Sequence, residues 1–438
     1  MPRSRQRGAA TLVVVMVLFF IISMVAAYTS RSMIFEQRTG ANLYRASQSL
    51  EAAEAGMEWA LNMLNGGRIT ATCAPSTAST DNTFRERYLD IAPVTGLIAA
   101  RTRSTGEQLM PTCVFNPGTG TWNCSCPVDA APSVSVPAGT GVAPAFRVRF
   151  RVPQTNFVSP LQPGIVRIDV VGCTRLDDNC LSINSQGLAN EGRTVLGTVA
   201  MLSGRAIALP QAALTARGNV NANGMNVANV RVSDSGVTVH ASGAIDTSGL
   251  SLTTIAGNAL GGSTLPNDAA INLPDLAPFT AAERFFAASF LLPPQRWQQM
   301  PAVVTLDCSS GCSAADVRDA IDDNPGRPLW LNGDLDIDTS GDIGTATAPV
   351  LMVINGDLSF TTAGVTIHGL VMLRPPGPSP TWAPTGNGRI RGAIVVDGAV
   401  SGTSTLAIEY DGQVLRAMQA TVGNFARVPG SWRDWTMP

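Results

Sequence analysis

The sequence predicts an α+β protein. A long N-terminal transmembrane and amphipathic helix packs on an antiparallel sheet, and a β-rich, β-helix-like domain follows. Three observations support this fold class. An apolar run continues into an amphipathic run, alternating strands occupy the middle of the chain, and short motifs in the C-terminal half recur at a spacing of 23 residues.

The 438 residues suffice for two or three domains with cores of their own. Charged residues make up only 14% of the chain and the net charge is −2, so no strong field attracts nucleic acid. We therefore expect no nucleic-acid partner.

The N-terminus reads as a membrane anchor. Arg3, Arg5 and Arg7 precede Gly8, and residues 9–30 carry no charge. A helix of about 20 such residues spans the ~30 Å hydrocarbon layer. The arginines favour the cytoplasmic side, which leaves the bulk of the chain outside. The side chains expected to pack in this layer and then against other helices are Val13, Leu18, Phe19, Phe20 and Ile21.

A cleaved secretory signal peptide is the alternative interpretation. Ala26 and Ala27 resemble its cleavage site, but the helical pattern continues beyond Ser30. No Pro occurs in residues 34–64, and Gly66-Gly67 then ends the helix, so one helix is expected over residues 9–65, with 9–30 transmembrane. Apolar residues at spacings of three and four predict a stripe that the sheet buries. This stripe comprises Leu43, Ala46, Leu50, Ala53, Met57, Ala60 and Leu64.

Three sequence features resemble the PilX-type pilus assembly proteins, a group of type IV prepilin-like chains. They are Arg5-Gln6-Arg7-Gly8-Ala9-Ala10 followed by Asn42-Leu43, the run Glu51-Ala52-Ala53-Glu54-Ala55-Gly56-Met57-Glu58, and the ending Ala426-Arg427-Val428-Pro429-Gly430-Ser431-Trp432-Arg433-Asp434-Trp435.

The resemblance implies that residues 1–8 are a leader that prepilin peptidase removes between Gly8 and Ala9, after which Ala9 is methylated. It implies a single-pass inner-membrane protein with a periplasmic globular part that later joins the pilus at the cell surface. Other minor pilins and the major pilin are the implied partners. Major pilins usually carry Glu as the fifth mature residue, whereas this chain has Val13. The difference is typical of a minor subunit near the tip, because a buried charge persists only when it is paired.

Residues 66–209 read as a pilin-like globular domain. Residues 146–152 alternate strictly, with Phe and Val predicted inward and Arg147, Arg149 and Arg151 outward. The three arginines form either an anion site or, more simply, a solvated strand face. Residues 165–171 and 194–202 are two further strands.

The eight cysteines follow the apolar run and favour disulfides over a zinc site. Cys173–Cys180 and Cys308–Cys312 are the pairs expected from proximity in the sequence, while the other four cysteines remain ambiguous.

Residues 210–438 read as the β-rich domain. Asn332-Gly333-Asp334-Leu335 recurs as Asn355-Gly356-Asp357-Leu358, and His368-Gly369 recurs as Arg391-Gly392, both at a spacing of 23. Stacked coils of a parallel β-helix are therefore expected, with an antiparallel sandwich as the alternative. Short strands are expected at 218–220, 230–232, 237–239 and 243–245. Helices are expected at 280–288, with Thr280 as N-cap, and at 314–321.

Candidate sites in this half are few, and no cofactor is expected. Asp334, Asp336, Asp338 and Asp342 are weak calcium candidates and more simply turn residues. His240 and His368 read as locally paired. Trp382, in a Pro-rich loop, is either an adhesive contact or a cap on the coils.

The sequence thus predicts a structural subunit that assembles or primes a type IV pilus, and no enzyme. A pilus-tip adhesin is the alternative. A type II secretion pseudopilin K is less favoured because its paired-calcium domain is not evident, and an envelope carbohydrate enzyme would need a catalytic acidic cluster.

Overall fold

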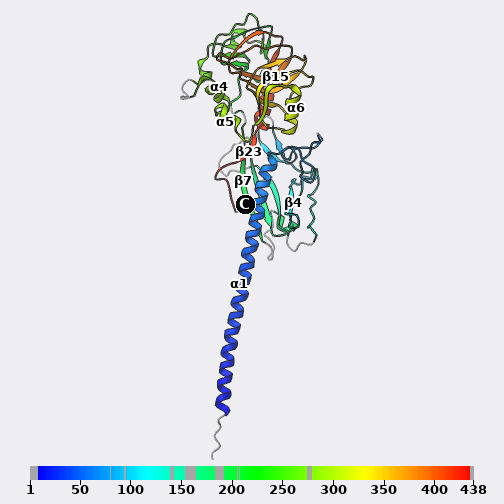
Figure 1. Cartoon of the computed structure of the whole chain (residues 1–438), viewed down its shortest axis with the longest axis vertical. Coiled ribbons are helices and arrows are strands. Elements are labelled where there is room, and N and C mark those ends of the chain that lie inside the picture. The colour runs from blue at the N-terminus through cyan, green and yellow to red at the C-terminus, as the bar shows by residue number, and fades with distance from the viewer. Residues whose placement is uncertain are drawn as a thin grey trace, which may run out of the picture.

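The computed structural model describes residues 8–78, 80–92, 95–138, 143–152, 164–182, 192–204, 206, 208–273 and 279–434. Helix α1 (Gly8–Leu64) extends away from the remainder of the chain and enters it only with its C-terminal turns (Figure 1). We call residues 8–48 of this helix the stem. The predicted fold class is confirmed: a long helix meets an antiparallel sheet, and a parallel β-solenoid follows.

The head is the sheet on which α1 packs, together with its loops. Its strand order is β23-β7-β6-β5-β3-β4, and every neighbouring pair is antiparallel. The strands are β3 (Thr112–Asn116), β4 (Thr121–Ser125), β5 (Ala145–Arg151), β6 (Ile165–Cys173), β7 (Arg193–Ser203) and β23 (Asn424–Arg427). The smaller elements of the head are α2 (Phe84–Tyr88), β1 (Leu89–Ile91), β2 (Ile98–Ala100) and α3 (Asp178–Leu181).

The three predicted head strands are present within two residues of their expected bounds. In β5, Phe146, Val148 and Phe150 are buried against α1, while the arginines between them are half-exposed. Alternation along the strand therefore predicted correctly which face meets the core.

The solenoid (residues 212–421) is an insertion between two strands of the head sheet. Strand β7 leads into it, and the chain returns as β23, whose Asn424 lies opposite Ser203 of β7. Figure 1 shows β23 and β7 side by side. The expected domain over residues 210–438 is therefore corrected at its end, because residues 424–427 belong to the head sheet.

The coils stack in parallel register. Gly369 pairs with Gly392 at the predicted spacing of 23, whereas Val350 pairs with Gly369 at a spacing of 19, so coil length varies. The C-terminal coils comprise β14 (Val304–Ser313), β15 (Leu329–Ile337), β16 (Val350–Ile354), β17 (Leu358–Phe360), β18 (Thr366–Leu373), β19 (Thr381–Trp382), β20 (Arg389–Val396), β21 (Ala399–Thr403) and β22 (Ala407–Tyr410).

The stacking order differs from the chain order. The first coil, formed by β8, β9 and β10, pairs with the last coil through β20, β21 and β22, and on its other side with β11 and β12. The chain therefore enters the stack in its middle. The N-terminal coil strands are β8 (Ala212–Ala216), β9 (Val220–Asn223), β10 (Asn226–Asn229), β11 (Val237–Ala241), β12 (Ser251–Thr254) and β13 (Thr264–Leu265), with η1 (Leu260–Gly262) and η2 (Ala269–Asn272).

Of the four short strands expected in this region, 237–239 lies within β11 and 218–220 overlaps β9 only at Val220, while the other two are corrected. Residues 230–232 lie outside the strands, and of residues 243–245 only Ile245 makes an isolated bridge, to Val220. The sequence pattern located the strand-rich segment. The pairing of the first coil with β20, β21 and β22 of the last coil decides which of its residues form strands.

Helices cover the side and one end of the solenoid. Helices α4 (Ala281–Phe290), α5 (Pro294–Gln298) and α7 (Gly412–Thr421) pack on the outer face of β15, β16, β18 and β20. Helix α6 (Ala314–Asp323) inserts Ala314, Val317 and Ala320 into the interior beside β14. Thr280 and Ser313 form capping boxes with Glu283 and Asp316, so the predicted Thr280 cap is present.

Candidate functional site

The stem is an apolar surface without protein cover. In the described residues, α1 is the one helix long and apolar enough to cross a membrane by length and composition. The five expected packing residues, Val13, Leu18, Phe19, Phe20 and Ile21, are all more than half exposed. Such a continuous apolar surface requires lipid or other helices around it. Helix α1 begins at Gly8 and runs unbroken past Ala26 and Ala27, while residues 1–7, which belong to the expected leader, lie outside the described part.

The C-terminal turns of α1, from Arg45 onward, lie very close to the sheet. A Cβ atom added to Gly172 would stand 2.3 Å from the carbonyl oxygen of Ser49, and one added to Gly192 would stand 2.2 Å from that of Arg45. Gly56, on the helix side, contacts Phe146 and Val170. Because no Cβ fits at these positions, glycine sets the distance between helix and sheet.

The buried face of α1 is shorter than the sequence predicted. Ala53, Met57, Ala60 and Leu64 are buried as expected. Leu43 is 66% exposed, Leu50 is 37% exposed, and Ala46 is also exposed, so the sheet does not bury these three. The spacing of apolar residues identifies a face of the helix, but not where the sheet ends. The exposed part of the stripe continues the stem surface.

A buried arginine joins the C-terminal end of α1, the head and the solenoid. The Arg85 guanidinium donates to the carbonyl oxygens of Leu64 (3.2 Å), Thr421 (3.0 Å) and Gly423 (2.9 Å) and lies over the ring of Phe425. Leu64 ends α1 and Thr421 ends α7, so the cation meets carbonyl groups at two helix C-termini. Burial lowers the pKa of Arg85 to about 10, which leaves it charged at neutral pH.

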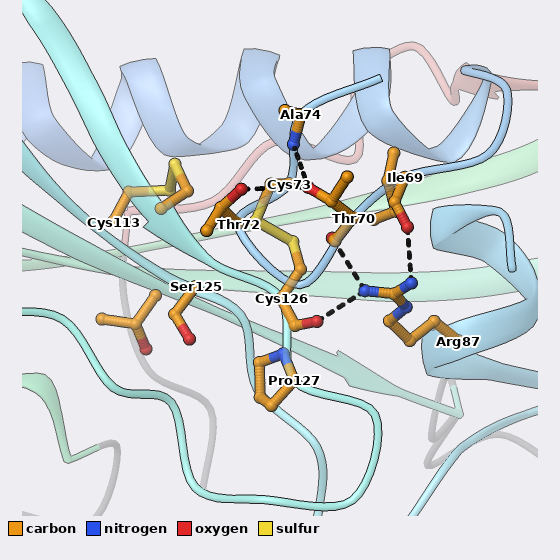
Figure 2. Close-up of a disulfide and its surroundings, with 12 residues drawn as sticks. Ile69, Thr70, Thr72, Cys73, Ala74, Arg87, Cys113, Ser125, Cys126 and Pro127 are labelled. Atoms are coloured by element: carbon orange, nitrogen blue, oxygen red, sulfur yellow. Dashed lines mark hydrogen bonds between the residues drawn. A yellow bond between two sulfur atoms is a disulfide. The ribbon is translucent and has the colours of Figure 1, made fainter. Parts of the chain in front are cut away.

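A second buried arginine holds the loop that follows α1. Arg87 donates to the carbonyl oxygens of Ile69 (2.6 Å), Thr70 (2.9 Å) and Cys126 (2.6 Å). Figure 2 shows these bonds converging beside the Cys73–Cys126 disulfide, which ties the same loop to the residue after β4. Arg85 and Arg87 were not singled out from the sequence. The Thr83-x-x-Glu86 capping box that starts their helix was the available signal.

The eight cysteines form four disulfides. Cys173–Cys180 and Cys308–Cys312 pair as expected from the sequence, and the ambiguous four pair as Cys73–Cys126 and Cys113–Cys124. Three of these disulfides lie in the head, where they fix loops and one hairpin around the sheet.

The arginine row of β5 is engaged in local bonds. Arg147 pairs with Asp178 (2.8 Å), Arg149 donates to the Gln108 side chain, and Arg151 lies 3.3 Å from the buried Asp169. These contacts support the solvated strand face over an anion site.

The four aspartates considered for calcium hold adjacent chain segments together. Asp334 accepts from the backbone of Asp357, Asp338 from that of Ala314, and Asp342 from that of Thr366. Asp336 accepts from the hydroxyl groups of Ser359 and Thr361. No group of three or more His, Cys, Asp or Glu side chains that could hold a metal occurs in the described residues.

The remaining candidate residues are structural or locally paired. Trp382 is buried in the solenoid core and donates to the carbonyl oxygen of Leu358 (3.0 Å), which corrects its reading as an adhesive contact. His240 bonds Asp268 at 2.7 Å, and His368 lies 3.7 Å from Asp342, as local pairing predicted.

Comparison with known proteins agrees with the stem geometry. Residues 7–58 match the family model described as PilX N-terminal. The N-terminal segment is therefore similar to that of the PilX-type proteins. No curated protein matches the chain.

A similar solved structure is that of the competence-associated pilin ComZ from Thermus thermophilus, at 9% identity. The match covers 89% of this chain and 97% of that one, with a TM-score of 0.22. At that score the likeness does not define the fold, and the similarity to PilX-type proteins rests on residues 7–58.

Proposed function

We propose that this chain is a minor pilin-like structural subunit of the type IV pilus. It inserts in the inner membrane, is cut by prepilin peptidase between Gly8 and Ala9, and then joins or primes the filament. The supporting observation is one uninterrupted helix whose exposed apolar N-terminal part lies in the PilX-type segment and whose C-terminal turns pack on the head sheet. Such a helix can leave lipid only if other helices cover it.

Its partners are the inner membrane, prepilin peptidase, other minor pilins and the major pilin. It acts as a structural component with no catalytic role. The test is to follow the mature chain in sheared, purified pili and to count pili in a strain that lacks it. Presence in the pilus fraction and loss of piliation support the proposal, whereas normal piliation with the chain confined to the membrane contradicts it.

Val13 fits a place near the tip of the filament. It is 58% exposed on the stem and leaves no carboxylate there to pair with a neighbouring N-terminal amine. Val13→Glu introduces a charge that needs such a partner, so it should alter subunit placement or piliation, while Val13→Leu should not. Normal pilus assembly and normal subunit placement in the Val13→Glu variant would contradict a place near the tip of the filament.

A second candidate function is pilus-tip adhesion. The solenoid lies at the end of the molecule opposite the stem (Figure 1), where it would meet a surface first. Because Ser203 and Asn424 are paired neighbours, the solenoid can be excised by joining them through a two-residue Asn-Gly turn.

In the excised chain, normal piliation with loss of surface attachment supports adhesion. Loss of piliation with a folded head instead supports a role of the solenoid in priming. Normal piliation with normal attachment contradicts the adhesin.

A further inference from the structure

A groove of about 510 Å³ runs beside α1 where the stem meets the head. Its volume lies within the range of about 300–1,000 Å³ typical of sites that bury a ligand group. One wall is the exposed side of α1 and the other is the β3–β4 hairpin. The lining residues are Tyr44, Gln48, Glu51, Ala52, Ala55, Phe115, Pro117, Trp122 and Pro144.

The hairpin wall is fixed in place. Cys113 and Cys124 lie directly opposite each other in the β3–β4 pair and form a disulfide across it. Trp122 packs against Phe115 at 5.3 Å and against Phe146 of the core at 4.7 Å, measured between ring centroids. A preorganised aromatic wall loses little conformational entropy on binding.

The charges of α1 fall in two bands. Residues 31–45 carry Arg31, Arg38 and Arg45 against a single Glu36, and residues 46–64 carry Glu51, Glu54 and Glu58 with no basic residue. The arginines repeat every seven residues, as do Glu51 and Glu58, so each set lies near one face of the helix. Glu51 lines the groove and Glu54 is exposed above it. Glu58 is also exposed, but it pairs with Arg427 of the same chain at 2.5 Å, so a second stem would share or replace that pair.

We propose that this groove binds the basic part of the stem, residues 31–45, of a second copy of this chain. The proposal rests on the proposed function, in which the stem must be covered by other helices. Two parallel stems at equal height would place like charges together, which is unfavourable. If the second stem is shifted along the helix axis by 13 residues, its Arg38 lies at the height of Glu51 of the first copy. Its Arg45 then lies at the height of Glu58 of the first copy.

At ~1.5 Å per residue this displacement is about 20 Å along the helix axis. The same register brings the exposed apolar residues Met33, Ile34 and Phe35 to the height of the groove. The groove therefore meets both the apolar and the basic side chains of the second stem.

The test places a photoreactive phenylalanine derivative at Trp122 in the full chain in detergent micelles. Mixing isotopically labelled and unlabelled chains separates adducts between copies from those within one copy. We expect an adduct between copies that maps to residues 31–45.

Charge reversal then tests the register. Glu51→Arg with Glu58→Arg, or Arg38→Glu with Arg45→Glu, should reduce the adduct at least fivefold. All four changes together should restore it to within twofold. Asp90→Arg, an exposed control on the head, should leave it unchanged.

All four disulfides are first checked to be intact. The proposal is then overturned by any one of three results: no adduct between copies, an adduct outside residues 31–45, or no recovery in the combined variant. An adduct formed only with the stem of a different subunit in whole pili also overturns it. Presence of the chain in pili is measured separately, so the proposed function can hold when the groove proposal fails.

Discussion

The side chain of Asn65 and the backbone of Phe425 exchange two hydrogen bonds across 360 residues of sequence. The Asn65 amide nitrogen donates to the Phe425 carbonyl oxygen at 2.9 Å, and the Phe425 amide donates to the Asn65 Oδ1 atom at 2.7 Å. Asn65 directly follows α1, and Phe425 lies in β23, just after the solenoid. The C-terminal end of α1 is thereby bonded to the strand through which the chain returns from the solenoid, and we call this contact the joint.

Arg85 should be the main polar element of this joint. Arg85→Met removes the donor to three carbonyl oxygens and leaves them buried, which should destabilise the full chain by about 2–4 kcal/mol. The matched change Arg389→Met removes an exposed pair with Glu409 and should change stability by less than about 1 kcal/mol. Denaturant unfolding of both variants in detergent checks this, and equal losses would contradict the role of Arg85.

Gly172→Ala should separate the helix from the sheet. The added Cβ meets backbone atoms of Ser49 and Ala53, which cannot rotate away, so a loss of about 1–3 kcal/mol or more is expected. Gly40→Ala is the control, because its Cβ meets nothing within 4 Å and alanine favours the helix by about 1 kcal/mol. Melting temperatures should move in opposite directions. A neutral Gly172→Ala would show that the close approach is not needed.

The Cys73–Cys126 disulfide should stabilise more than Cys308–Cys312. The separations are 53 and 4 residues, and the chain-entropy relation gives a difference of about 2 kcal/mol for closing loops of these lengths. Replacing each pair by alanines and comparing urea midpoints checks the prediction. Removal of Cys73–Cys126 also frees the loop that Arg87 holds, so protease cleavage within residues 68–78 should increase in that variant alone.

Acid should weaken the cap of α6. Hydrogen bonds from the Ser313 backbone and hydroxyl hold the pKa of Asp316 below its ordinary value of 3.8. A carboxyl group with a lowered folded pKa contributes stability above its unfolded pKa and loses it as pH falls through the folded pKa. Asp316→Asn should therefore cost about 0.3–1 kcal/mol at pH 7 and give a shallower loss of stability below pH 3.8. Asp319→Asn, exposed one turn later, should retain the wild-type pH profile.

The stem and the repeat could be predicted from the sequence because local pattern specifies them. An uncharged run without Pro specifies a long helix whatever surrounds it, and motifs such as Asn332-Gly333-Asp334 and Asn355-Gly356-Asp357 recur wherever similar coils stack. Cys173–Cys180 and Cys308–Cys312 were predicted because few residues separate the partners.

The return strand and the stacking order could not be predicted in this way. Residues 424–427 are four residues with no alternation that distinguishes them, and they pair with β7 across more than 200 residues of chain. Leu43 and Leu50 share spacing with Met57, yet only the extent of the sheet decides which of them is buried. The sequence did not decide between the two roles of Trp382, because the burial of its ring depends on the neighbouring coil that carries Leu358.

Mass spectrometry of the N-terminus of the mature chain shows whether the whole stem is kept. An anchor that is carried intact into a filament must begin at Ala9, so we expect a first residue Ala9 with a methylated amine. A chain that begins near residue 28 would have lost most of the apolar stem to signal peptidase, and it could not be a pilin-like subunit.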